Sequence, residues 1–177
     1  MPMVPELKRV VVEVFGGCNY TCQMCPQTTG RGASWLKLMP LSLFTKILDE
    51  VPGTPLINLE GSGEPTMAKQ LPAYINECTK RGLESFICTN GARLTGDFMK
   101  RCVDAGLSNV RFSIIGYNEE TYKKWMNSDN FYIIQDNIKK LLEYIESSNA
   151  KCEVSSYHLI LDNKNIEYET AAYQKIV

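Results

Sequence analysis

Three cysteines lie within eight residues in the stretch Cys18-Asn19-Tyr20-Thr21-Cys22-Gln23-Met24-Cys25-Pro26. They follow residues 10–15, a short apolar run rich in β-branched side chains that ends at Gly16 and Gly17. This pattern predicts a buried β-strand, so we expect the cysteines on the loop that leaves its carboxyl end. Thiolates this close in sequence can converge on one metal ion or cluster. Polar residues and glycines flank the cysteines, which disfavours the alternative of three neighbouring core cysteines.

A closed structural zinc site needs four Cys or His ligands. The nearest further candidates are Cys78 and His158, the only histidine, and neither has the spacing of a paired ligand. A [4Fe-4S] cluster held by three thiolates leaves one iron open, which suits catalysis better than plain electron transfer. The cysteines therefore favour a cluster with an open iron, and a zinc site stays an alternative.

The spacing of three residues between the first two cysteines and two residues between the last two resembles the motif of radical S-adenosylmethionine (SAM) enzymes. This resemblance implies a [4Fe-4S] cluster on Cys18, Cys22 and Cys25, with SAM chelating the open iron through its amino and carboxylate groups. It also implies that Met24, where many members carry an aromatic residue, packs near the SAM adenine. The implied chemistry is reductive cleavage of SAM to methionine and a 5′-deoxyadenosyl radical, which abstracts a hydrogen atom from the substrate.

At 177 residues, with 44% hydrophobic and 22% charged residues, the composition is that of one globular domain, expected to span residues 1–177. The net charge of −1 gives no general attraction to nucleic acid or acidic membranes. We expect no signal peptide and no transmembrane helix, because the amino-terminal apolar run is short and bracketed by charges. Seven cysteines without an export signal indicate reduced thiols or a cluster. We therefore expect a cytoplasmic protein that binds neither nucleic acid nor membrane.

Short apolar runs alternate with helical patterns along the chain. The runs that predict strands are residues 10–15, 56–60, 86–89, 110–115 and 152–160, and a polar loop is expected over residues 27–37. This alternation predicts an α/β fold with a parallel sheet of about five strands. Both a doubly wound sheet and a (β/α) barrel satisfy it. Because the unusual polar residues follow successive strands, where barrels assemble active sites, we favour a partial (β/α) barrel of the radical SAM type.

Three further motifs match positions at which radical SAM enzymes bind SAM. Ser62-Gly63-Glu64 after the second strand resembles the family's Gly-Gly-Glu element, which receives the SAM amino group, and Gly63 permits a close backbone approach. Thr89-Asn90 after the third strand resembles residues that line the site. Ser113 on the fourth strand resembles the serine at the SAM ribose. Each motif alone is also typical of an ordinary turn or strand.

Many members carry an arginine beyond the fourth strand that clamps the SAM carboxylate. This chain has Lys123 and Lys124 there, and we expect Lys124 to take that role, although a lysine cannot pair in bidentate fashion. Two lysines on an amphipathic helix are more often simply part of a solvated face. The sequence leaves open whether Cys88 on the third strand and His158 on the fifth face the substrate or pack in the core.

The Cys-Gln-Met-Cys-Pro and Gly-Glu-Pro sequences are similar to the subgroup with a C-terminal SPASM or twitch extension. The resemblance implies a peptide or a small polar, sugar-like or aminocyclitol-like substrate, and flavodoxin or ferredoxin as electron donor. Members have a sixth strand and further cysteines after the fifth strand, so we expect this core to be incomplete. The alternatives are a noncatalytic iron–sulfur or zinc-binding module and an inactive truncated remnant.

Overall fold

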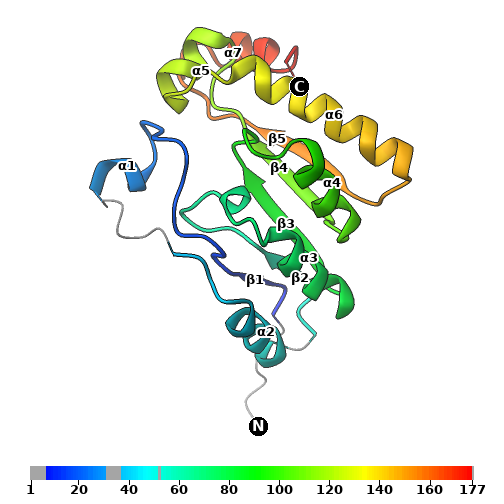
Figure 1. Cartoon of the computed structure of the whole chain (residues 1–177). Coiled ribbons are helices and arrows are strands. Elements are labelled where there is room, and N and C mark those ends of the chain that lie inside the picture. The colour runs from blue at the N-terminus through cyan, green and yellow to red at the C-terminus, as the bar shows by residue number, and fades with distance from the viewer. Residues whose placement is uncertain (1–6, 31–36, 52, 177) are drawn as a thin grey trace.

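The computed structural model describes residues 7–30, 37–51 and 53–176. Strands and helices alternate along the chain (Figure 1). The strands are β1 (Arg9–Val11), β2 (Leu56–Asn58), β3 (Glu84–Thr89), β4 (Asn109–Ser113) and β5 (Glu153–Tyr157). The helices are α1 (Pro26–Gly30), α2 (Leu41–Glu50), α3 (Leu71–Lys80), α4 (Gly96–Asp104), α5 (Glu119–Met126), α6 (Phe131–Ser148) and α7 (Ile166–Tyr173), with the 3₁₀ turn η2 (Pro65–Met67) before α3.

The strands of the described chain form one parallel sheet in the order β1-β2-β3-β4-β5. Each strand pairs with the one before it, because the intervening segment crosses back over one face, as parallel neighbours require. The register pairs Cys88 of β3 with Arg111 of β4, and Ser113 of β4 with Tyr157 of β5. The predicted α/β fold with about five parallel strands is confirmed.

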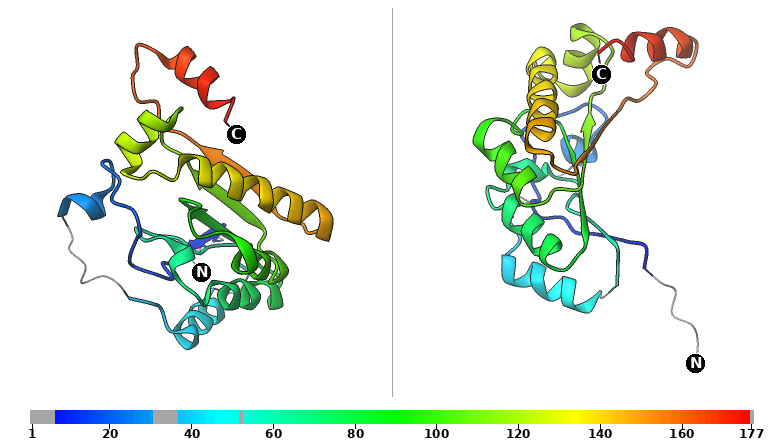
Figure 2. Two further views of the ribbon diagram at one scale, coloured as in Figure 1. Left: turned by 45° about the horizontal axis from the view of Figure 1, so that its top comes forward. Right: turned by 90° about the vertical axis from the view of Figure 1, so that its right-hand side faces the viewer.

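Helices cover one face of the sheet. Viewed along the sheet edge, α2, α3, α4 and α6 form a layer on one side of the strands (Figure 2). The buried strand side chains that point toward this layer include Ile57, Ile87, Val110 and Phe112. Since successive residues of a strand point to opposite faces, Cys88 and Arg111 project from the other face. That open face and the loops at the carboxyl ends of the strands form the site described below.

The first strand is shorter than predicted. Of residues 10–15, the ladder with β2 keeps only the part within Arg9–Val11, although Val12 N–H still donates to Asn58 O at 2.8 Å. Further on, Phe15 forms an antiparallel bridge with Leu38. The segment before α2 therefore holds the approach to the cysteine loop. The apolar pattern of residues 12–15 is compatible with pairing to β2 or to the segment before α2, so the sequence did not show which of the two pairs with it.

Other boundaries also differ from the expectation, and β2 and β4 end at Asn58 and Ser113, each two residues before the predicted limit. The segment expected as a loop over residues 27–37 begins inside α1, which starts directly after Cys25 with Pro26 at a position where its missing N–H is tolerated. Residues 31–36 of that expected loop lie outside the described part of the chain. Strand β5 ends at Tyr157, three residues before the predicted limit. None of the described helices is long and apolar enough to cross a membrane.

Candidate active site

A cavity of about 490 Å³ opens at the carboxyl ends of the strands. Cysteines of the loop after β1, the loop after β2 and residues of β3, β4 and β5 line it. Its walls include Cys18, Cys22, Met24, Cys25, Ser62, Gly63, Glu64, Thr89, Asn90 and Ser113. The structure thus brings together ten of the eleven residues that the sequence nominates, and Lys124 is the exception.

The three loop cysteines are half-buried and form no disulfide. The Tyr20 backbone N–H donates to Cys18 Sγ at 3.4 Å, and Asn90 Nδ2 lies 3.9 Å from the same sulfur. Burial raises the pKa of Cys18. Burial, with the neighbouring Cys18 and Cys25 as smaller causes, raises the pKa of Cys22 to about 11. Binding a metal centre must therefore release protons from these thiols at neutral pH.

Polar contacts hold the cysteine loop against the junction of α5 and α6. Tyr20 is buried, and its hydroxyl accepts hydrogen bonds from Tyr122 Oη at 3.2 Å and Asn130 Nδ2 at 2.9 Å. Thr21 Oγ1 accepts from Asn127 Nδ2 at 2.7 Å. These partners lie more than 100 residues away in the chain, so no local sequence signal revealed them. The anchors place the cysteines at the mouth of the sheet.

The donor set fits a cluster better than a single ion. Within the described residues, no three Cys, His, Asp or Glu side chains lie close enough together to hold one metal ion. A cubane binds each thiolate to a different iron, so its ligands need not share one coordination shell. Three thiols on the wall of one cavity, with space beside them, therefore suit a [4Fe-4S] cluster rather than a closed zinc site.

Gly63 is required by the backbone of the cysteine loop. A Cβ at this position would lie 1.8 Å from Phe15 O and 2.9 Å from Gly17 O. On the segment that leads from β1 to the cysteines, Glu13 Oε1 accepts hydrogen bonds from the backbone N–H groups of Ser62 at 2.6 Å and Gly63 at 3.0 Å. Gly63 therefore packs against the protein's own chain entering the cysteine loop, and the expected approach to SAM stays a prediction.

Glu64 is 4% exposed, and its carboxylate accepts four hydrogen bonds. Oε1 accepts from the Thr66 N–H at 3.0 Å and from the hydroxyls of Thr66 and Thr89, both at 2.6 Å. Oε2 accepts from the Asn90 N–H at 2.8 Å. Burial raises the pKa of Glu64, and these donors oppose the rise. The Glu64 backbone is engaged as well, since its N–H donates to Gly17 O at 2.7 Å and its C=O accepts from the Met67 N–H at 3.1 Å, so Glu64 supports the site from behind.

Ser113 lies in the cavity wall, whereas Lys124 lies outside it. Ser113 lines the cavity, and its Oγ donates to the Tyr157 hydroxyl at 3.0 Å. Lys124 is exposed on α5, with Nζ 5.7 Å from the Trp125 ring centroid, and it is not part of the cavity wall. The solvated-face alternative describes its position.

The sequence analysis missed two charged residues of the cavity wall, Glu60 and Arg111. Strand alternation would have found Arg111, because it lies two residues before Ser113 on β4 and so points to the same face, whereas Glu60 lies just past the end of β2. Alternation also answers the question left open for Cys88, which lines the cavity two residues before Asn90. Burial is the main cause that raises the pKa of Cys88 to about 12, so its thiol stays protonated near neutral pH.

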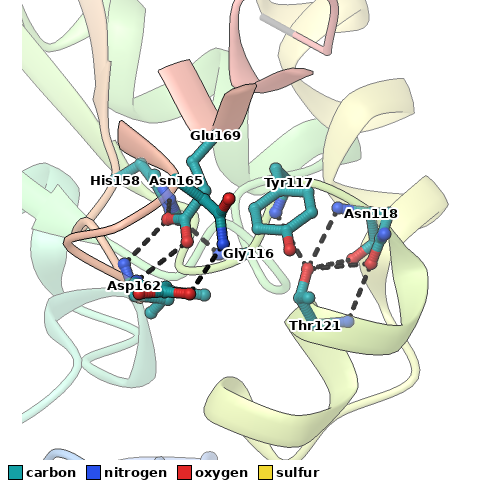
Figure 3. A network of polar contacts seen from close by, with 9 residues as sticks. Gly116, Tyr117, Asn118, Thr121, His158, Asp162, Asn165 and Glu169 are labelled. Atoms are coloured by element: carbon teal, nitrogen blue, oxygen red, sulfur yellow. Dashed lines mark hydrogen bonds and ion pairs between the residues drawn. The ribbon is translucent and has the colours of Figure 1, made fainter. Parts of the chain in front are cut away.

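His158, also left open by the sequence, does not line the cavity but docks α7 (Figure 3). Its Nδ1 accepts from the Gly116 N–H at 3.1 Å, so Nε2 carries the hydrogen and faces Glu169 Oε2 at 3.4 Å. The Glu169 carboxylate also accepts from the N–H groups of Leu161 and Asp162 at 2.7 and 2.8 Å. The His158 and Glu169 side chains are only 4% and 2% exposed, so this network is structural.

Comparisons with known proteins show the family of this chain. The family profile of the radical SAM superfamily matches residues 12–173. The chain therefore belongs to the radical SAM superfamily, a family of enzymes that use a [4Fe-4S] cluster and SAM.

Two curated relatives and one solved structure illustrate the likeness. The tungsten-containing aldehyde ferredoxin oxidoreductase cofactor-modifying protein of Pyrococcus furiosus is 29% identical over 79% of this chain and 40% of its own length. The AdoMet-dependent heme synthase of Methanosarcina barkeri is 28% identical over 98% of this chain and 48% of its own length. Streptococcus suis SuiB bound to S-adenosylmethionine matches with a TM-score of 0.71 at 15% identity, over 96% of this chain and 38% of SuiB.

The SuiB likeness confirms the predicted partial barrel of the radical SAM type. The chain spans less than half the length of the two curated relatives. Cofactor class and fold are therefore shown at the level of the family, and the substrate and net reaction are matters of proposal.

Proposed function

We propose that this chain forms the SAM-cleaving core of a radical SAM enzyme that abstracts a hydrogen atom from a peptide or a small polar substrate. The observation that carries the proposal is the convergence of Cys18, Cys22 and Cys25 on one cavity at the carboxyl ends of β2, β3 and β4. When bound by three thiolates, a [4Fe-4S] cluster supplies the electron for reductive cleavage of SAM, which yields the hydrogen-abstracting radical.

Different residues of the cavity wall bind different parts of SAM. The backbone carbonyls of Ser62 and Gly63 accept from the amino group of SAM. The Ser113 hydroxyl binds the ribose, and Met24 packs against the adenine. Glu64 holds this arrangement from inside, through its bonds to Thr89 and Asn90. The cavity also shields a reactive species from water, because apolar side chains contribute part of its lining.

The partners and the compartment follow from the same proposal. Reductive cleavage needs a one-electron donor, and flavodoxin or ferredoxin supplies electrons of this kind. We propose a cytoplasmic location, since reduced thiols and an oxygen-sensitive cluster suit a reducing compartment.

Anaerobic reconstitution with iron and sulfide tests the proposal. The unmutated chain should bind about four irons, the content of a cubane centre. Cys22→Ala should lose most of the iron, whereas Cys152→Ala, at a half-buried cysteine outside the cavity wall, should keep it. SAM should shift the electron paramagnetic resonance signal of the reduced cluster. Stoichiometric zinc without a cluster spectrum would contradict the proposal, and a cluster that ignores SAM would favour the noncatalytic module.

A further inference from the structure

Glu60, Cys88 and Arg111 form a row across the open face of the sheet. Cys88 and Arg111 are register partners on β3 and β4. Asn58 is the partner of Phe86, and the Leu59 N–H still donates to Phe86 O at 2.8 Å, so Glu60, just past the end of β2, lies beside Cys88. Adjacent strands are about 4.8 Å apart, which places the Cα atoms of Glu60 and Arg111 about 10 Å apart. All three side chains line the cavity.

The two charges of this row are not neutralised within the protein. In the described part of the chain, no carboxylate lies within ion-pair distance of Arg111, and its guanidinium instead lies 5.2 Å from the Phe86 ring centroid. Glu60 Oε1 accepts from Asn58 Nδ2 at 2.8 Å, and its other oxygen has no hydrogen-bond donor among the described residues. Aromatic stacking and the Asn58 bond thus orient two unlike charges toward the cavity without pairing them.

Cys88 lies between these charges and senses both. Burial is the main cause that raises the pKa of its thiol; the Glu60 carboxylate adds to the rise and the Arg111 guanidinium opposes it. The Cys88 thiol is therefore close to both Glu60 and Arg111 and lies between them. A ligand that bridges Glu60 and Arg111 has to lie over Cys88.

This row is distinct from the groups assigned to SAM. Arg111 precedes Ser113 by two residues on β4, which corresponds to about 6.6 Å along a parallel strand, and Glu60 precedes the Ser62-Gly63 turn. A ligand bound at the row therefore lies beside SAM, deeper along the open face than the cysteine loop.

We propose that Glu60 and Arg111 bind the substrate through its ammonium and carboxylate groups, so that the substrate is an amino acid or carries an amino-acid end. This inference rests on the proposed function, because it assigns SAM to the neighbouring part of the cavity. The guanidinium offers paired N–H donors to a carboxylate, and the glutamate accepts from an ammonium. A neutral sugar could exchange hydrogen bonds with both side chains through its hydroxyls, but it would neutralise neither charge.

Calorimetric titration of the reconstituted, SAM-loaded protein without reductant tests the inference. Three probes share one side chain, which suits the neighbouring Ile115 and Leu159: L-leucine with both charges, N-acetyl-L-leucine with the carboxylate alone, and L-leucinamide with the ammonium alone. L-Leucine should bind about ten-fold more tightly than either of the other two. In Arg111→Gln, L-leucine should bind no more tightly than L-leucinamide. In Glu60→Gln, L-leucine should bind no more tightly than N-acetyl-L-leucine. Arg101→Gln and Glu146→Gln, exposed on α4 and α6, are matched controls that should change neither.

SAM carries the same two groups at its methionine end, so its own affinity is measured in each variant. A ten-fold loss of SAM affinity in Arg111→Gln or Glu60→Gln would assign the row to SAM and overturn the inference. Equal affinity for the three probes, or binding of none, would also overturn it. Failure of the proposed function has a different signature, because the unmutated chain would then lack iron or SAM binding before any probe is added.

Discussion

The carboxylate of Glu64 accepts a hydrogen bond from the backbone N–H of Asn90 at 2.8 Å. Together with the bond from the Thr89 hydroxyl, this contact ties the loop after β2 to the end of β3. The Asn90 amide, in turn, lies 3.9 Å from Cys18 Sγ. A residue that the sequence assigns to SAM binding is therefore also a support for one of the expected cluster ligands.

Glu64→Gln should change the pH dependence of stability. Burial raises the pKa of Glu64 above its ordinary value of 4.5, so the folded chain keeps this proton at pH values where the unfolded chain has lost it. The stability that results is fully present below pH 4.5 and is lost as the pH rises through the folded pKa. The free energy of unfolding of the unmutated chain, minus that of Glu64→Gln, should therefore fall with rising pH. Denaturant unfolding across this range measures it, and a difference that grows with pH would refute the assignment.

Gly63→Ala should damage both folding and cluster binding. The new Cβ would meet Phe15 O at 1.8 Å, so the backbone before the cysteines has to move. Gly82→Ala is the matched control, because its φ of +69° brings strain but no atom lies within 4 Å of the new Cβ. The control should lose about 1–2 kcal/mol of stability and keep its iron. Gly63→Ala should lose more stability, and iron as well; iron content equal to that of the control would be the contrary result.

Tyr20→Phe should loosen the cysteine loop. Its hydroxyl accepts from Tyr122 and Asn130, and removing it leaves the buried Tyr122 hydroxyl and the half-buried Asn130 amide without this acceptor, at a cost of about 1–3 kcal/mol. Iron should also be lost faster to a chelator. Tyr132→Phe, at a tyrosine that is 62% exposed, should stay within about 0.5 kcal/mol of the unmutated chain. Equal rates of iron release from the two variants would show that the Tyr20 hydroxyl does not anchor the cysteine loop.

Glu169→Ala should undock α7 without disturbing the cluster site. The substitution removes the acceptor for the N–H groups of Leu161 and Asp162 and the partner of His158, a local cost of about 1–3 kcal/mol. Hydrogen exchange should accelerate in α7, while iron content stays unchanged because this network does not line the cavity. Glu167→Ala, exposed on the same helix, should leave exchange unaltered. Loss of iron in Glu169→Ala would show that α7 supports the site.

Local patterns in the sequence predicted most of the fold and of the cavity wall. The spacing of Cys18, Cys22 and Cys25, and the polar residues after successive strands, depend only on neighbours in the chain. The anchor from Tyr20 to Tyr122 and the bridge from Phe15 to Leu38 depend on tertiary contacts, which no periodicity encodes.

Arg111 was missed for a second reason. The family resemblance directed the search for a cation to the SAM carboxylate and to the segment after β4, where the role of Lys124 stays a prediction. The structure places Arg111 in the cavity wall, and the alternation of side chains along β4 was the physical signal for it.

The sheet order, which follows the order of the chain, has a consequence for how the protein is made. Each strand can pair with its predecessor as the polypeptide leaves the ribosome, since no strand waits for a distant partner. The cysteines are synthesised before the anchors Tyr122 and Asn130 and the wall residue Tyr157. Cluster insertion therefore has to follow the synthesis of these later residues, and until then the nascent chain carries three thiols that oxidants can reach.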